Sequence, residues 1–131
     1  RSVDISKFIV EINTDESLDP SVVGSKAAAV AELVKHKIKV PRAFTIKTSV
    51  FDDFIHPITD EITTILTKVE TDNVSSAFKA AESICEILAS QELPVGLAES
   101  VKSRLISTKS TMAVRSSATA EDLKDASFAG I

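Results

Sequence analysis

Apolar residues recur at helical spacing through most of this 131-residue chain, and this periodicity limits the possible folds more than any other feature. The clearest run covers residues 74–88, where apolar side chains return every three or four positions and predict an amphipathic helix. Ser49 and Pro94 have the residue types that favour the N-cap and the first position of a helix. Further helices are predicted from residue 24 to about 39, from 49 to 55, from 58 to 69 and from 94 to 105.

Short segments of another kind interrupt these helices. Residues 7–12 suit a strand or an extended entry segment, and residues 43–47 alternate as a strand does. Residues 111–114 are predicted to form a buried strand that runs directly into Arg115. The combination predicts a helix-rich α+β fold.

Composition excludes several classes of protein. Apolar residues make up 44% and the net charge is -4, as in globular proteins without a polyanion-attracting field. Trp and Tyr are absent, which argues against a single-stranded nucleic-acid surface. No apolar run reaches the roughly 20 residues of a membrane span, and no signal-peptide core opens the chain, so the cytoplasm is the expected location. Cys85, the only cysteine, excludes an internal disulfide and is expected in the core.

The first junction at which chemistry is expected runs from residue 23 to residue 28. A turn of small residues, Gly24-Ser25, leads into a helix with Lys26 in its first turn. Backbone N–H groups at a helix start favour an anion, and Lys26 adds a full charge. A lysine that is merely solvated explains the same pattern.

The second junction is the segment from Val114 to Gly130, which places Arg115 before two serines. The planar guanidinium of arginine matches phosphate oxygens, although an ion pair with a nearby acid is the alternative. Glu121 and Asp122 have the chemistry of metal ligands. The preferred interpretation is that Thr119 caps a short helix, with Asp122 closing a capping box.

Together these segments resemble the N-terminal domain shared by phosphoenolpyruvate synthase, pyruvate phosphate dikinase and rifampicin phosphotransferase. The resemblance rests on three motifs in the same order, which cover nearly the whole chain. They are Gly24-Ser25-Lys26-Ala27-Ala28, Val40-Pro41-Arg42-Ala43-Phe44-Thr45-Ile46, and the run from Val114-Arg115-Ser116-Ser117 through Asp125-Ala126-Ser127-Phe128-Ala129-Gly130.

The resemblance implies roles for three residues. Lys26 and Arg115 match the family's phosphate-binding lysine and arginine, and Gly130 matches a glycine that lies against the nucleotide. The chain departs from the family pattern at three positions. Ser25 replaces a second glycine, Lys124 a common proline, and Ile131 a glutamine.

For the molecule as a whole, the resemblance implies that residues 1–131 are the first portion of an ATP-grasp nucleotide-binding domain. The intact enzyme would use ATP and Mg²⁺ to phosphorylate a histidine on a partner domain, which passes the phosphoryl group to pyruvate. The metal ligands are expected outside this fragment, which is therefore predicted to be inactive alone. A rifampicin phosphotransferase, a pyruvate phosphate dikinase or a non-catalytic binding module of the same fold remain alternatives.

The remaining candidates have structural explanations. His36 is expected at a helix C-terminus and His56 at a junction between helices. The basic group formed by Lys35, Lys37, Lys39 and Arg42 either binds phosphate or is a solvated helix tip, and the second interpretation is preferred.

Overall fold

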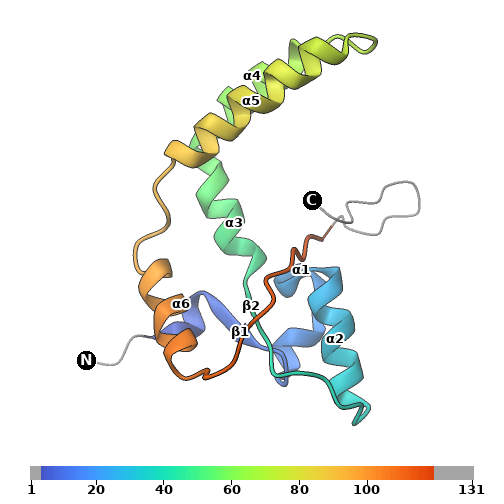
Figure 1. Ribbon diagram of the computed structural model, residues 1–131, viewed down its shortest axis with the longest axis vertical. Coiled ribbons are helices and arrows are strands. Elements are labelled where there is room, and N and C mark those ends of the chain that lie inside the picture. The colour runs from blue at the N-terminus through green and yellow to red at the C-terminus, as the bar shows by residue number, and fades with distance from the viewer. Residues whose placement is uncertain (1–3, 120–131) are drawn as a thin grey trace. The chain divides into compact units, whose positions relative to one another are not determined.

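The computed structural model describes residues 4–119 and divides the chain into two compact units (Figure 1). One unit combines the residues up to Val50 with those from Val95 onward, and the other runs from Phe51 to Pro94. The strands are β1 (Ile9–Glu11) and β2 (Phe44–Ile46), and the α-helices are α1 (Pro20–Val23), α2 (Ser25–Lys35), α3 (Thr48–Ile55), α4 (Thr59–Thr67), α5 (Val74–Ser90) and α6 (Leu97–Ile106). Short 3-10 helices cover Ile5–Lys7, Asp15–Leu18 and His56–Ile58.

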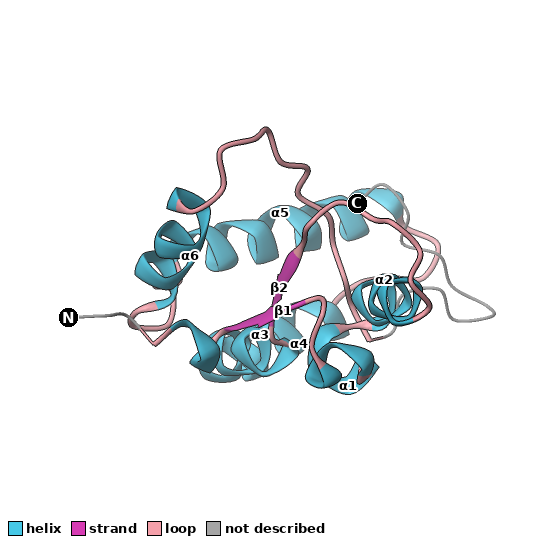
Figure 2. Cartoon of the chain, turned by 90° about the horizontal axis from the view of Figure 1, so that it is seen from below, coloured by secondary structure: helices cyan, strands magenta, loops and turns pink. Residues whose placement is uncertain are grey.

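The first unit is built around a two-stranded antiparallel sheet, drawn in magenta in Figure 2. Val10 pairs with Thr45 at the centre of the ladder, and Ile9 and Glu11 pair with Ile46 and Phe44. Backbone bonds extend the pairing at both ends, from Ile12 N–H to the Ala43 carbonyl at 3.2 Å and from Lys47 N–H to the Phe8 carbonyl at 2.8 Å. The strands predicted within residues 7–12 and 43–47 are therefore confirmed, in shorter form.

Strand β1 divides the core of this unit into two clusters, because successive side chains of a strand point to opposite faces. Ile9 packs with Phe8, Val50 and Leu97, a cluster that α6 helps to close. Val10 packs with Val23 and Ala28, which come from α1 and α2. The sheet thereby holds the first turn of α2 in a fixed position.

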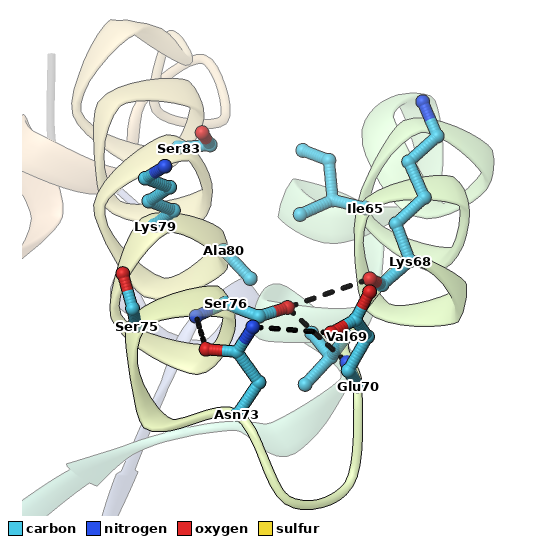
Figure 3. A pocket seen from close by; sticks show the side chains of 10 residues that line it. All are labelled: Ile65, Lys68, Val69, Glu70, Asn73, Ser75, Ser76, Lys79, Ala80 and Ser83. Carbon is cyan, nitrogen blue, oxygen red and sulfur yellow. Dashed lines mark hydrogen bonds between the residues drawn. The ribbon is translucent and has the colours of Figure 1, made fainter.

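The second unit contains the helical hairpin of α4 and α5 (Figure 1). Asn73 caps α5 by accepting a hydrogen bond from Ser76 N–H at 3.1 Å, and its amide also donates to Glu70. Figure 3 shows these bonds at the turn, beside a pocket of 440 Å³ between the two helices. The predicted helix over residues 74–88 is confirmed.

The prediction that Cys85 lies in the core is wrong, because this side chain is exposed. Periodicity marks an apolar face on α5, but only part of that face is covered in this unit. Ala80 is buried, whereas Val74 and Phe78 are 70% and 67% exposed. An apolar stripe identifies the face that can be buried, and the neighbouring elements decide how much of it is.

Residues 111–114 do not form the predicted buried strand. Within the described residues the segment pairs with neither β1 nor β2, and Val114 is 99% exposed. A strand is stable only when a neighbouring strand satisfies its backbone groups.

Two predicted helix starts are also displaced. Helix α3 begins at Thr48, so Ser49 lies inside it rather than at its N-cap. Helix α6 begins at Leu97 after Gly96, whose φ of 89° suits glycine, so Pro94 precedes the helix. The proline therefore lies in the connection that leads into α6.

Candidate functional site

The candidate site is built on the junction between α1 and α2. Asp19 caps α1 by accepting a hydrogen bond from Ser21 N–H at 2.9 Å, and Gly24 is the C-cap residue of α1. Gly24 is also the N-cap of α2, with a φ of 85° that side chains disfavour. Glycine has no side chain that can accept a hydrogen bond, so the N-cap residue of α2 does not cap the helix.

Ser117 supplies the missing cap from 90 residues further along the chain. Its hydroxyl accepts a hydrogen bond from Ala27 N–H at 3.0 Å and donates one to the Val23 carbonyl at 2.9 Å. Ser25 adds two further bonds to the same segment. Its N–H donates to the Ala118 carbonyl at 3.2 Å, and its hydroxyl donates to the Thr119 carbonyl at 3.3 Å.

Gly24 is also required by the closeness of this contact. A Cβ atom at position 24 would lie 2.2 Å from the carbonyl oxygen of Ser117, far inside van der Waals distance. The glycine therefore permits both the backbone turn and the approach of residues 117–119.

These contacts correct one part of the sequence interpretation. The sequence predicts that the backbone N–H groups at this helix start, which include those of Ser25 and Ala27, favour an anion. Both are hydrogen-bonded to Ala118 and Ser117 instead. The N–H groups of Ser25 and Ala27 are therefore not open to an anion in this structure.

Lys26 and Arg115 line the same pocket, which has a volume of 170 Å³. The pocket lies between the first turns of α2, strand β2 and the segment that follows residue 112. The Lys26 side chain there is half-buried, and Arg115 is exposed. The structure thus brings together two cations that lie 89 positions apart in the sequence. Gly130, Glu121, Asp122, Lys124 and Ile131 lie outside the described residues.

A larger pocket of 610 Å³ adjoins this one and shares Arg115, Phe44 and Ala113 with it. Among the described residues, its lining includes Arg42, Arg104 and Lys109 and no acidic side chain. Arg42 lines this pocket, whereas the other members of the predicted basic group, Lys35, Lys37 and Lys39, do not.

Arg104, on the wall of the larger pocket, was not anticipated from the sequence. Its side chain is 7% exposed. The guanidinium forms a two-bond ion pair with Glu11 and lies over the Phe44 ring, with Cζ 4.8 Å from the ring centroid. Hydrogen bonding to Glu11 raises the pKa of Arg104 above its ordinary value. These contacts join α6 to the sheet. Because the guanidinium N–H groups of Arg104 are already bonded to Glu11, we assign Arg104 a structural role.

Neither histidine lies at the candidate site. His36 is the C-cap residue of α2, and its Nδ1 lies 2.8 Å from the Glu32 carbonyl oxygen. His56 begins the 3-10 turn between α3 and α4, as expected for a junction.

Residues 4–119 contain no group of three His, Cys, Asp or Glu side chains placed to hold a metal ion. Over the same residues, no helix has the length and apolar character needed to cross a membrane.

Comparison with known proteins gives a consistent result. A family model described as "Pyruvate phosphate dikinase, AMP/ATP-binding domain" matches residues 20–131. The probable phosphoenolpyruvate synthase of Methanocaldococcus jannaschii is 31% identical over 97% of this chain and 11% of its own length. The phosphoenolpyruvate synthase of Aquifex aeolicus is 31% identical over 98% of the chain and 17% of its own length.

A rifampicin phosphotransferase of a Streptomyces species is 30% identical over 95% of the chain and 16% of its own length. The chain thus spans less than a fifth of each of these three relatives. No solved structure matches the chain significantly.

Proposed function

Because this chain belongs to the pyruvate phosphate dikinase AMP/ATP-binding domain family, we propose that it is the ATP-binding part of a phosphoenolpyruvate synthase-like dikinase. The observation that supports particular residues in this role is that Lys26 and Arg115 line the same pocket. In this proposal the two side chains neutralise the phosphate groups of ATP.

The chemistry of the pocket supports this assignment. Arginine presents a planar fork that binds two phosphate oxygens at once, whereas lysine acts as a compact point charge. Phosphoryl transfer depends mainly on positioning and on neutralising charge, and both residues serve those needs. Among residues 4–119, the ion pairs of Lys47 with Glu16, of His36 with Glu32 and of Arg104 with Glu11 do not involve Arg115.

The size of the pocket limits how much of the nucleotide it can hold. Ligand pockets for whole cofactors measure roughly 300–1,000 Å³, and this one measures 170 Å³. We propose that it takes the phosphate end of ATP only. The base would then be bound elsewhere in the complete protein, as expected of an ATP-grasp domain of which residues 1–131 are the first portion.

Magnesium is implied by the family chemistry, but the described residues do not fit it. Lysine and arginine carry no lone pair for a cation, and residues 4–119 offer no carboxylate cluster. The proposal therefore assigns no metal ligand within these residues and no step that passes through the ion.

The proposal extends to the intact enzyme as the family resemblance describes it. ATP would phosphorylate a histidine on a partner domain, and pyruvate would receive the phosphoryl group in the cytoplasm. The similarity to a rifampicin phosphotransferase supports a second candidate, in which an antibiotic is the acceptor. A non-catalytic module of the same fold remains the third.

The test is calorimetric titration of ATP into the full-length protein and into a Lys26→Ala, Arg115→Ala double variant. Loss of both charges should weaken ATP binding by at least about tenfold, since a charge-assisted bond contributes about 1.5–3 kcal/mol. A folded double variant with unchanged ATP affinity would refute the assignment of this pocket. Assays with pyruvate and rifampicin then distinguish the acceptors.

A further inference from the structure

Helix α2 differs from α1 and α5 in how its first turn is capped. Asp19 and Asn73 cap α1 and α5 from the residue directly before each helix. Helix α2 has Gly24 at that position and takes its capping oxygen from Ser117 instead.

The bond between Ser117 and Ala27 lies close in sequence to both Lys26 and Arg115. Ala27, which donates to the Ser117 hydroxyl, directly follows Lys26, and Ser117 lies two residues after Arg115. One hydroxyl therefore links the backbone that carries Lys26 to the backbone that carries Arg115.

We infer that Ser117 is a positioning residue that sets the distance between Lys26 and Arg115 through its hydroxyl group. This inference rests on the proposed function, in which the two cations bind the same phosphate groups. The segment from 111 to 119 has no regular secondary structure, so its own backbone does not fix Arg115. The bonds to Val23 and Ala27, with those of Ser25 to Ala118 and Thr119, join it to α2.

The geometry requires a small side chain that both donates and accepts. The hydroxyl donates to the Val23 carbonyl and accepts from Ala27 N–H, and alanine can do neither. The Ser117 side chain also lies close against Gly24, since its Oγ would be 2.5 Å from a Cβ atom if position 24 carried one. Serine is the residue type that meets both conditions at the lowest volume.

The test compares Ser117→Thr with Ser117→Val in the full-length protein. The two side chains have nearly the same shape, so any crowding beside Gly24 is common to both, and they differ in the hydroxyl. We expect Ser117→Val to bind ATP about 3- to 10-fold more weakly than Ser117→Thr, the range expected for one or two neutral hydrogen bonds. Amide exchange at Ala27 should also be faster in Ser117→Val than in Ser117→Thr.

Asn73→Ala provides the matched control. It removes a helix cap of the same kind, the bond from Ser76 N–H, in the other compact unit of the chain. We expect it to lower the melting temperature and to leave ATP affinity unchanged. If Asn73→Ala weakens ATP binding as much as Ser117→Val does, the effect of Ser117 is general destabilisation and the inference is wrong.

The remaining outcomes separate this inference from the function on which it rests. Equal ATP affinities for Ser117→Thr and Ser117→Val, with weaker binding by Lys26→Ala and Arg115→Ala, would overturn the role of Ser117 alone. Unchanged affinity in all four variants would overturn the proposed phosphate site as well. Should Ser117→Val fail to fold, Ser117→Ala, which introduces no bulk, is compared with the unsubstituted protein by the same criteria.

Discussion

Lys26 and Arg115 are the two residues on which the proposed function depends. The family resemblance assigned both to phosphate, and the structure places them around one pocket. The two positions differ in whether the shape of the side chain matters in addition to its charge.

For Arg115, the fork geometry should matter as well as the charge. We expect Arg115→Ala to reduce kcat/KM for ATP in the full-length protein roughly 10- to 150-fold, the equivalent of one charge-assisted bond. Arg115→Lys should recover only part of this loss, since lysine cannot bind two oxygens in parallel. Steady-state kinetics with varied ATP measures both effects. Full recovery by lysine would show that charge alone suffices there.

For Lys26, function and stability should separate. A cation in the first turn of a helix opposes the helix dipole, so Lys26→Ala should not lower the melting temperature. It should nevertheless weaken the use of ATP. A lower melting temperature together with unchanged nucleotide affinity would show that Lys26 is structural.

Ser25→Gly, which restores the family residue, should be tolerated.

At the scale of elements, hydrophobic periodicity predicted the secondary structure of a segment but not which of its side chains are buried. Helix α5 and both strands of the sheet follow from spacing alone, because local side-chain pattern decides helix or strand. Cys85 and residues 111–114 were misplaced because burial and strand pairing depend on neighbours distant in sequence. The cap that Ser117 gives to α2 was unpredictable for the same reason: it joins positions 90 residues apart.

The Glu11–Arg104 ion pair should be the polar contact that matters most for the stability of the first unit. Glu11→Gln leaves the buried guanidinium without its charged partner, which costs about 1–3 kcal/mol. We expect a clear fall in the midpoint of urea unfolding. Glu16→Gln is the control, because it breaks the more exposed pair with Lys47 and should cost less than about 1 kcal/mol. Equal effects would argue against a special role for Arg104.

At the scale of the whole molecule, the limiting fact is that this chain corresponds to less than a fifth of the relatives it resembles. We expect the 131-residue chain by itself to bind ATP no better than about millimolar and to hydrolyse none. Arg115 is exposed and Lys26 half-buried, so their charges are screened and each contributes only about 1 kcal/mol. That does not offset the several kilocalories per mole lost on association.

Calorimetry with ATP and Mg²⁺ on this chain and on the full-length protein measures the difference. A binding free energy near -4 kcal/mol corresponds to a Kd of about 1 mM, whereas a complete nucleotide site should reach the micromolar range. Micromolar binding by the 131-residue chain would mean that a complete site already exists within it. In that case the pocket of Lys26 and Arg115, at 170 Å³, would be only part of a site that extends beyond the phosphate groups.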